Sequence, residues 1–432
     1  MKKLFTIAAS ALFVLSTFSQ TNSTVNGTNM CQTSEVMKQL YASDAKAKLE
    51  NDQFELFTQQ FTNQQAALKT TTGACYVIPV VFHVYGTTQS GKTVTNSIII
   101  NAINALNNDF HALNSDYNSV HTSFQSTRGA MPDITFALAQ LDPNGNATNG
   151  IVYHPTASGF GNGSGYDALI AADAWDNFKY MNVYVQNDLY NNTVYTNSGV
   201  AWYPNFTMSN NKTARVVYNG AYLGTNTSVE FASVLTHEFG HWLNLIHTFE
   251  GGCVPPNDNV ADTPLCDYGG SSYNCHTTST ANNPLNCNNE LINAENYMDY
   301  AGAYGCYRMF TQGQVTRVYA ALLHPARQPL WQPSNLVATG LSHLCAFTSI
   351  KSNSLLSDNV KLYPNPANSQ LNIHIPTNLI GMNYAIYDQL SKIISGGKLD
   401  AEKTTINTTN LNSGMYILKI SGTIIIKKII IE

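Results

Sequence analysis

The sequence predicts a mixed α/β domain that follows a helical N-terminal segment and precedes a small all-β module. In the central part, apolar runs typical of buried strands alternate with helical patterns. The N-terminal part has weakly apolar helical patterning, and the last part has short alternating runs separated by turn residues. Strands mixed with long helical segments are typical of the α/β and α+β classes. With 432 residues, the chain is long enough for about two to four domains.

We expect the central domain between residues 75 and 335. Residues 78–84 have the continuous apolar pattern of a buried strand, and residues 98–106 have the pattern of a helix. Further strands are predicted at residues 134–141, 181–185 and 216–223, and a closing helix at residues 312–323, before Pro325.

The first 74 residues contain two segments. Lys2 and Lys3 precede an apolar stretch at residues 4–15 and then small and polar residues, which is the order of a secretory signal peptide. We therefore expect residues 1–20 to be a signal peptide. Residues 21–74 contain 9 of the chain's 49 charged residues and predict a helical prosegment with little core of its own.

The composition changes again beyond the central domain. Residues 336–357 are expected to form a linker, whose second half is rich in Ser and Asn. Residues 358–432 then contain short alternating runs, and Ser421 and Gly422 lie between the last two as a hairpin turn. These features predict a small C-terminal all-β sandwich.

Composition excludes several classes of function. Charged residues make up 11% of the chain, and the net charge is −5, without any basic block. A nucleic-acid groove or a patch for anionic membranes needs clustered Lys and Arg, so neither partner is expected. No apolar stretch reaches the roughly 18 residues of a membrane span. We expect an exported, soluble monomer, and eight cysteines fit an oxidising compartment.

Two histidines and a glutamate predict metal chemistry. His237 and His241 are four residues apart in a stretch with helical periodicity, for which Thr227 and Glu230 can form a capping box. Their imidazoles would lie on one face of the helix, where both can meet one Zn²⁺ ion. Glu238 would lie beside the metal as a general base.

The third ligand would be His247, six residues after His241, so the chain must turn sharply between them. Glycine normally makes such a left-handed turn, and Asn244 is the next most tolerant residue type for it. The alternative interpretation is a helix that carries solvated or buried histidines by accident. The coincidence of all four residues at this spacing, in a chain with 11 histidines, favours the zinc site.

These residues also carry a family resemblance. Residues 237–249, with the sequence HEFGHWLNLIHTF, resemble the zinc helix of metzincin proteases, specifically of the pappalysin family and its ulilysin-like bacterial members. Residues 296–300, with the sequence NYMDY, resemble the Met-turn of that family. Further similarities lie at residues 78–84, 175–183, 251–253 and 262–264. The resemblance covers about residues 75–325 and implies a metzincin fold, with a zinc cleft between an upper subdomain of twisted sheet and helices and an irregular lower subdomain.

The resemblance implies a role for each site residue. The three histidines would hold zinc and leave its fourth position to water, and Glu238 would move the proton of that water. Met298 would form an apolar floor under the imidazoles. Tyr300 matches the family tyrosine that can stabilise a developing oxyanion, the alternative being an ordinary tyrosine of the cleft. The substrates would be proteins and peptides.

The resemblance also implies a calcium site and two disulfides. Asp258, the Ala261 carbonyl and Thr263 offer the oxygen ligands that Ca²⁺ prefers, although a solvated turn would have the same composition. The disulfides implied by the family are Cys253–Cys287 and Cys275–Cys306. The remaining cysteines that the sequence does not pair are Cys75, Cys266 and Cys345.

The C-terminal module resembles the type A sorting domain of type IX secretion. The resemblance rests on residues 363–366, with the sequence YPNP, on residues 411–416, and on the final lysine-bearing strand. It implies export to the cell surface or the medium, with the type IX machinery as partner. The alternative is a carbohydrate-binding or adhesive β-sandwich.

Together these observations predict a secreted zinc endopeptidase. The rival from another class is a non-catalytic, zinc-stabilised surface adhesion or binding protein, which would have no use for a general base at Glu238. An exopeptidase would need a site for a free terminus, and none is identifiable. Residues 301–306 lack the carboxylate that directs related enzymes to basic residues, so we predict no preference for cleavage before Arg or Lys.

Latency is predicted from Cys31, which stands alone in the prosegment. Its thiolate is a strong zinc ligand and could fill the fourth position of the metal. The alternative is a disulfide with Cys75 or Cys345. Activation would follow a cut near Lys69, in a polar run just before the first strand of the central domain.

Overall fold

The computed structural model describes residues 31–65, 75–155, 162, 164–266, 285–300, 306–344, 360–388, 393–420 and 426–432. Within them the helices are α1 (Thr33–Ser43), α2 (Ala45–Gln65), α3 (Asn96–Phe110), α4 (Asp167–Asp173), α5 (Phe206–Asn210), α6 (Val229–Ala232), α7 (Val234–Trp242), α8 (Gln312–Leu322) and α9 (Pro333–Ala338). None of these helices is long and apolar enough to cross a bilayer. The predicted signal peptide, residues 1–20, lies outside the described residues.

The central domain is built on one mixed sheet. Its strands are β1 (Tyr76–Tyr85), β5 (Ile134–Leu138), β6 (Ile151–His154), β7 (Met181–Val185), β8 (Gly199–Ala201) and β9 (Val216–Tyr218). The order is β5-β1-β7-β9-β8, and β6 pairs with β1 beyond the end of β5. Every pairing is parallel except β8 with β9. The antiparallel β8 is therefore the edge strand, and it lies against α7.

The remaining short strands of this domain are β2 (Thr88–Gln89), β3 (Lys92–Thr93), β4 (Arg128–Gly129) and β10 (Phe310–Thr311). They form two antiparallel pairs, β2 with β3 and β4 with β10. The second pair joins the start of α8 to the loop that precedes β5.

Both faces of β1 are buried, which explains its continuous apolar sequence. Ile78, Val80, Phe82 and Val84 belong to the main core, together with the inward faces of α3 and α7. The intervening residues, such as Tyr85, belong to clusters on the other face. The predicted strand and helix patterns are thus confirmed here, except that β9 ends at Tyr218 and is followed by a short 3₁₀ turn.

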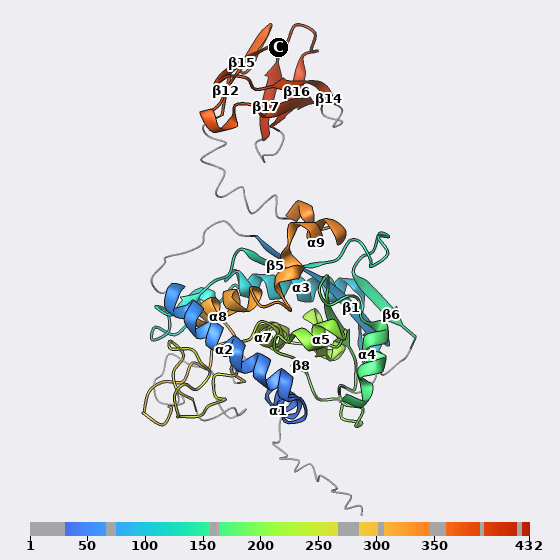
Figure 1. Ribbon diagram of the computed structural model, residues 1–432, viewed down its shortest axis with the longest axis vertical. Coiled ribbons are helices and arrows are strands. Elements are labelled where there is room, and N and C mark those ends of the chain that lie inside the picture. The colour runs from blue at the N-terminus through green and yellow to red at the C-terminus, as the bar shows by residue number, and fades with distance from the viewer. Residues whose placement is uncertain are drawn as a thin grey trace, which may run out of the picture.

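The N-terminal helices lie across the central domain. Figure 1 shows α1 and α2 in blue, with α2 beside α8. Met37 of α1 is buried in the aromatic cluster on the face of the sheet opposite the main core, and Phe54 of α2 enters the main core. The helical prosegment was predicted to have little core of its own, and its buried residues do pack into the core of the central domain.

The central domain continues past the boundary expected at residue 335. After α8, the chain returns to β1 through a 3₁₀ turn at Gln328–Trp331 and through α9. Leu336 and Leu341 pack against Val77 of β1. The aliphatic residues here were too few to stand out as a helix in the sequence, which is why the expected linker began too early.

The C-terminal module has its own core and is all-β, as predicted. Its strands are β11 (Lys361–Tyr363), β12 (Gln370–His374), β13 (Asn383–Tyr387), β14 (Ile393–Lys398), β15 (Lys403–Asn407), β16 (Gly414–Ile420) and β17 (Ile426–Ile431). They form a three-stranded sheet, β11-β12-β15, and a four-stranded sheet, β14-β13-β16-β17. Alternate residues of both sheets fill one apolar core. The predicted turn at Ser421 and Gly422 lies outside the described residues, between the antiparallel strands β16 and β17.

Candidate active site and metal centre

The helix that carries the metal motif is shorter than its sequence periodicity suggests. A break at Ser233 divides the stretch into α6 and α7. Ser228, through its hydroxyl, accepts from the Phe231 amide and caps α6, so the predicted capping box of Thr227 and Glu230 is wrong. Both Ser and Thr are good N-caps, and the sequence alone favoured the position with a glutamate three residues later.

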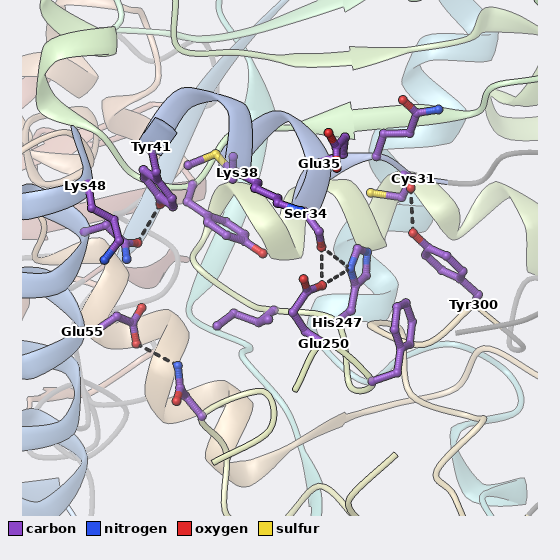
Figure 2. A pocket seen from close by; sticks show the side chains of 17 residues that line it. Cys31, Ser34, Glu35, Lys38, Tyr41, Lys48, Glu55, His247, Glu250 and Tyr300 are labelled. Carbon is purple, nitrogen blue, oxygen red and sulfur yellow. Dashed lines mark hydrogen bonds and ion pairs between the residues drawn. The ribbon is translucent and has the colours of Figure 1, made fainter. Parts of the chain in front are cut away.

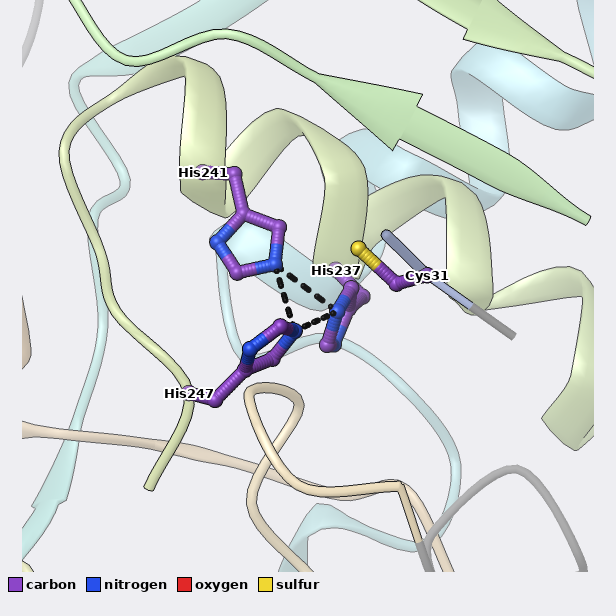
Figure 3. A group of neighbouring side chains, drawn as sticks. All are labelled: Cys31, His237, His241 and His247. Atoms are coloured by element: carbon purple, nitrogen blue, oxygen red, sulfur yellow. Dashed lines mark hydrogen bonds between the residues drawn. The ribbon is translucent and has the colours of Figure 1, made fainter. Parts of the chain in front are cut away.

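The three predicted histidines meet at one point, as Figure 3 shows. The Nε2 atoms of His237, His241 and His247 are 3.0 to 3.2 Å from one another. The Nδ1 atom of His237 lies 2.7 Å from the Tyr297 carbonyl oxygen, and that of His241 lies 2.7 Å from the Leu245 carbonyl oxygen. Because a carbonyl only accepts, each of these Nδ1 atoms carries the proton.

The Nε2 lone pairs of His237 and His241 therefore point at each other and at His247 without a proton to share. Burial, together with the neighbouring imidazoles, lowers the pKa values of His237 and His241, so both rings are neutral at physiological pH. Converging lone pairs at these distances repel in the absence of a cation, and tetrahedral zinc takes such a set of nitrogens. The donor set therefore fits zinc.

The turn that brings His247 to the metal centre is made by Asn244. Its φ is +69°, in the left-handed region that the sequence analysis required at this residue. The turn also directs the Leu245 carbonyl at His241. One bend of the backbone thus positions His247 and fixes the tautomer of His241.

The positive φ of Asn244 predicts that substitutions at this position differ in their effect on stability. Asn244→Gly and Asn244→Ala both remove the side-chain amide, but only alanine is strained at positive φ. We expect the free energy of unfolding of the alanine variant to be about 1 kcal/mol lower than that of the glycine variant. Urea denaturation followed by tryptophan fluorescence measures the difference. Equal midpoints for the two variants would contradict the proposed importance of the turn.

Glu238 lies beside the metal centre and is fully buried. Its Oε2 lies 3.5 Å from the Cys31 sulfur, and its Oε1 has no hydrogen-bond partner among the described residues. Burial raises the pKa of Glu238. Gly199 on the edge strand β8 permits this arrangement, because a Cβ there would be only 2.6 Å from the Glu238 carboxylate.

Cys31 closes the metal centre from the N-terminal segment. Its sulfur and the three Nε2 atoms lie within 4.8 Å of one another. Cys31 is a free thiol and so is not in the disulfide that the sequence left open. Cys31 forms a parallel bridge with Gly199. The Thr33 amide donates to the Cys31 sulfur at 3.4 Å, and the thiol donates to the Thr33 hydroxyl oxygen at 3.2 Å. Burial, and secondarily Glu238, raises the pKa of the thiol when no cation is present.

The Met-turn residues support the site from below. Met298 is fully buried. Its sulfur packs so closely against Gly240 of α7 that a Cβ at position 240 would be only 2.5 Å from it. The preceding residue, Tyr297, supplies the carbonyl that orients His237. Tyr300 donates a hydrogen bond of 2.7 Å to the Cys31 carbonyl oxygen, as Figure 2 shows. Tyr300 therefore already binds a peptide carbonyl beside the metal centre.

Sequence reasoning missed two groups that contact His247. Glu250 lies with its Oε2 3.2 Å from the Nδ1 of His247, and Ser34 of α1 lies with its hydroxyl 2.9 Å from the same atom (Figure 2). Ser34 also donates to Glu250. A carboxylate three residues after the last histidine was a usable signal, because metal-bound imidazoles commonly donate their other N–H to a carboxylate. No comparable pattern marks Ser34.

The predicted calcium ligands lie in one loop. Asp258 is fully buried, and its Oδ1 accepts from the Thr263 hydroxyl at 2.7 Å. Its Oδ2 has no partner among the described residues, and burial raises the pKa of Asp258 to about 7. Ala261 is exposed in the same loop. Its neighbour Asp262 accepts from the Thr311 hydroxyl and the Gly313 amide, so it anchors the start of α8.

The disulfide Cys253–Cys287 is present, as the resemblance implied. Cys75 and Cys306 are also disulfide-bonded, and Cys266 is buried. Cys275 and Cys345 lie outside the described residues, so the predicted pair Cys275–Cys306 remains a prediction. The stretch on which the specificity prediction depends, residues 301–305, also lies outside them.

Comparisons with known proteins agree with this geometry. A family model described as pregnancy-associated plasma protein-A, of the M43 peptidases, matches residues 164–323, and one described as a secretion system C-terminal sorting domain matches residues 361–432. An extracellular metalloprotease of Verticillium alfalfae is 28% identical over 58% of this chain and 77% of its own length. One of Colletotrichum graminicola is 38% identical over 22% of this chain, which spans only 32% of that relative.

A solved structure of promirolysin from Tannerella forsythia, in a mutant form, is similar over 71% of this chain and 98% of its own, with 26% identity and a TM-score of 0.55. In its fold and in these matches the chain is similar to metallopeptidases. Residues 164–323 are thus similar to the M43, or pappalysin, peptidases, and residues 361–432 are similar to secretion system C-terminal sorting domains. The sorting domain assigns the chain to the cell surface or the extracellular space.

Proposed function

We propose that the chain is a secreted zinc endopeptidase, made as a latent precursor and exported through the type IX pathway. In this proposal residues 1–20 are a signal peptide, residues 21–74 a prosegment, and residues from about 358 the sorting domain. The substrates are proteins and peptides, and the enzyme acts as a monomer.

One observation carries the proposal. Three neutral imidazoles converge, and beside them lie a carboxylate with one oxygen unpartnered among the described residues and a thiol from the N-terminal segment. A structural zinc site would take all four ligands from the permanent domain and would have no use for Glu238. The arrangement therefore favours catalysis over the alternative of a zinc-stabilised adhesion protein.

Zinc at the three histidines would acidify a water and polarise the substrate carbonyl. Glu238 takes the proton of the attacking water and returns it to the leaving amine. Its unpartnered Oε1 offers an acceptor for that water. Tyr300 stabilises the oxyanion by donating a hydrogen bond to it, as its hydroxyl donates to the Cys31 carbonyl oxygen in this structure. In this comparison the Cys31 carbonyl stands in for the carbonyl of a bound peptide.

Digestion of a peptide library by the activated full chain tests the proposed activity. We expect internal peptide bonds to be cut, and the cutting to stop when a chelator removes zinc and to return when zinc is added. Release of terminal residues alone, or cutting that resists the chelator, would contradict the endopeptidase assignment.

Latency is proposed to result from Cys31, whose thiolate would take the fourth zinc position in the precursor. The strand-like pairing of Cys31 with Gly199 supports this, because it holds the sulfur over the imidazoles and occupies the edge strand where substrate would pair. A cut near Lys69, outside the described residues, would then allow the prosegment to leave.

The corresponding prediction concerns Cys31→Ala. We expect this precursor to mature faster than the parent, or to hydrolyse a peptide before it is cut, because water can reach the metal. Cys266→Ala is the matched control, since it removes a buried sulfur outside the zinc cluster. Time courses of maturation and peptide hydrolysis measure the effect. Equal latency of the Cys31→Ala precursor and the parent would exclude Cys31 as the blocking ligand.

A structural calcium ion is proposed at Asp258, Thr263 and the Ala261 carbonyl. The support is a buried carboxylate oxygen that has no partner among the described residues, which would be costly without a cation. The ion would hold this loop, whose Asp262 in turn anchors α8.

We therefore predict that calcium raises the melting temperature of the chain and that Asp258→Asn abolishes the increase. Asp400→Asn, an exposed change in the C-terminal module, is the control. Thermal unfolding with EGTA and with excess calcium provides the measurement. A calcium effect of the same size in the Asp258→Asn variant would remove Asp258 from the site.

A further inference from the structure

Helix α2 buries one face against the central domain, away from the histidine cluster. Ala47, Phe54 and Thr58 are buried on this face, at helical spacing. Two glutamates, Glu50 and Glu55, flank Phe54 and point to the same side, toward α8 and the end of α7. In a chain with only 11% charged residues, two carboxylates on an inward helix face need partners.

Glu55 has a full set of partners. Arg317 of α8 donates to it through both terminal nitrogens, one of them at 2.8 Å. The side-chain amides of Asn244 and Asn259 also donate to the Glu55 carboxylate, at 3.2 and 3.3 Å. Glu55 is labelled in Figure 2. The Arg317 side chain is 2% exposed, and its Nε donates to the Asn244 carbonyl oxygen at 2.6 Å. Four donors therefore surround one carboxylate.

These donors come from three parts of the catalytic domain. Asn244 makes the turn that leads to His247, Asn259 lies in the proposed calcium loop, and Arg317 lies on α8. A forked guanidinium matches a carboxylate in two parallel hydrogen bonds, which is the strongest common form of such a contact. The cradle is thus complete in the catalytic domain, and only the carboxylate comes from α2.

Glu50 has a second set of partners one and a half turns earlier on α2. The Asn205 side-chain amide donates to it at 3.0 Å, the Phe206 amide donates to its other oxygen, and the His324 Nε2 lies 3.3 Å away. The His324 ring packs edge-on against Phe54, with ring centroids 4.5 Å apart. The buried Arg327 adds positive charge near Glu50.

We propose that this face of the catalytic domain is a carboxylate-binding site that holds α2 independently of zinc and of Cys31. After the chain is cut between α2 and β1, the prosegment stays bound through Glu50, Phe54 and Glu55. The occupant is α2 itself, an acidic helix with two carboxylates on either side of an aromatic ring. The inference depends on the proposed precursor organisation only for the position of the cut.

The experiment uses the full chain with Cys31→Ala and Glu238→Gln, so that neither a zinc–thiolate bond nor self-cleavage contributes. A recognition site for a sequence-specific protease is inserted after Lys69. After the cut, gel filtration shows whether the prosegment fragment elutes with the rest of the chain, and dilution gives its dissociation rate. We expect co-elution, and dissociation about 10- to 100-fold faster with Glu55→Gln, because hydrogen bonds to a charged group are lost.

Asp52→Asn is the matched control. Asp52 lies on the same helix, is 50% exposed and pairs only with Lys48 in the described structure, so its variant should dissociate at the parent rate. A synthetic peptide of residues 45–65 provides a test that needs no folded variant. We expect it to displace the fragment from the parent chain, and the same peptide with Glu55→Gln to fail.

Two results would overturn the proposal. One is release of the fragment as soon as the Cys31→Ala, Glu238→Gln chain with an unchanged α2 is cut. The other is equal dissociation rates for the Glu55→Gln and Asp52→Asn variants of that chain. Neither result bears on the zinc site or on Cys31, since the background lacks Glu238 and the thiol. Conversely, loss of the proposed peptidase activity would leave this binding site unaffected.

Discussion

Replacing Glu238 with Gln should lower kcat by about 10²- to 10⁴-fold and leave zinc bound at one equivalent. The amide has the shape of the carboxylate but cannot take a proton from water, and proton transfer by a positioned side chain contributes about this factor. The three imidazoles that hold the metal are unchanged, and their N–H groups donate to other partners. Peptide hydrolysis and metal analysis of the activated protein measure the two quantities.

The control for this prediction is Glu230→Gln on α6, a partly exposed glutamate outside the zinc cluster. We expect this variant to keep its activity. Unchanged hydrolysis by the Glu238→Gln variant would end the assignment of Glu238 as the base. Loss of zinc together with activity would show instead that Glu238 is needed to hold the metal.

The second large effect is expected for Tyr300→Phe, with kcat lower by about 10²- to 10³-fold and KM little changed. A donor aimed at a developing oxyanion acts mainly in the transition state, and removal of one such donor costs about this factor. Burial raises the pKa of Tyr300, so its hydroxyl keeps its proton and can donate at neutral pH. Steady-state kinetics on one peptide separates kcat from KM.

Tyr203→Phe is a demanding control, because Tyr203 lines the same pocket and its ring lies 5.8 Å from that of His241. We expect a much smaller effect for this variant, since no contact of its hydroxyl with the Cys31 carbonyl exists in the described structure. A similar loss of kcat in the Tyr300→Phe and Tyr203→Phe variants would show that Tyr300 has no special role in stabilising the oxyanion.

The histidine cluster could be predicted from sequence because its geometry is local. His237 and His241 are one helical turn apart, and Asn244 is the residue at which the chain had to turn to bring in His247. The fold of the central domain was predictable for the same reason. The strands β1 and β7 are buried on both faces, so both are mostly apolar, and the polar His83 and Asn182 within them contact each other.

The groups that orient the ligands were not predictable in this way. The carbonyls of Tyr297 and Leu245 fix the tautomers of His237 and His241, yet every residue has a carbonyl, so the sequence contains no mark for them. The capping box failed because two adjacent residues, Thr227 and Ser228, could each cap a helix, and only tertiary packing decides between them.

The binding of α2 was also outside the reach of sequence. Glu55 and Arg317 are separated by 262 positions, and nothing in either local pattern identifies the other as its partner. The segment is weakly apolar because its inward face uses carboxylates and a single aromatic ring in place of a continuous apolar stripe.

The central claim is that one zinc ion is held by three histidines and, in the precursor, by the Cys31 thiolate. Zinc K-edge X-ray absorption of the full-length Glu238→Gln chain tests it directly. We expect one zinc per chain, with three nitrogen ligands at about 2.0–2.1 Å and one sulfur at about 2.3 Å. In the same chain with Cys31→Ala, the sulfur shell should be replaced by a light atom. A precursor without zinc, or a zinc shell without sulfur in the unsubstituted thiol background, would contradict the account.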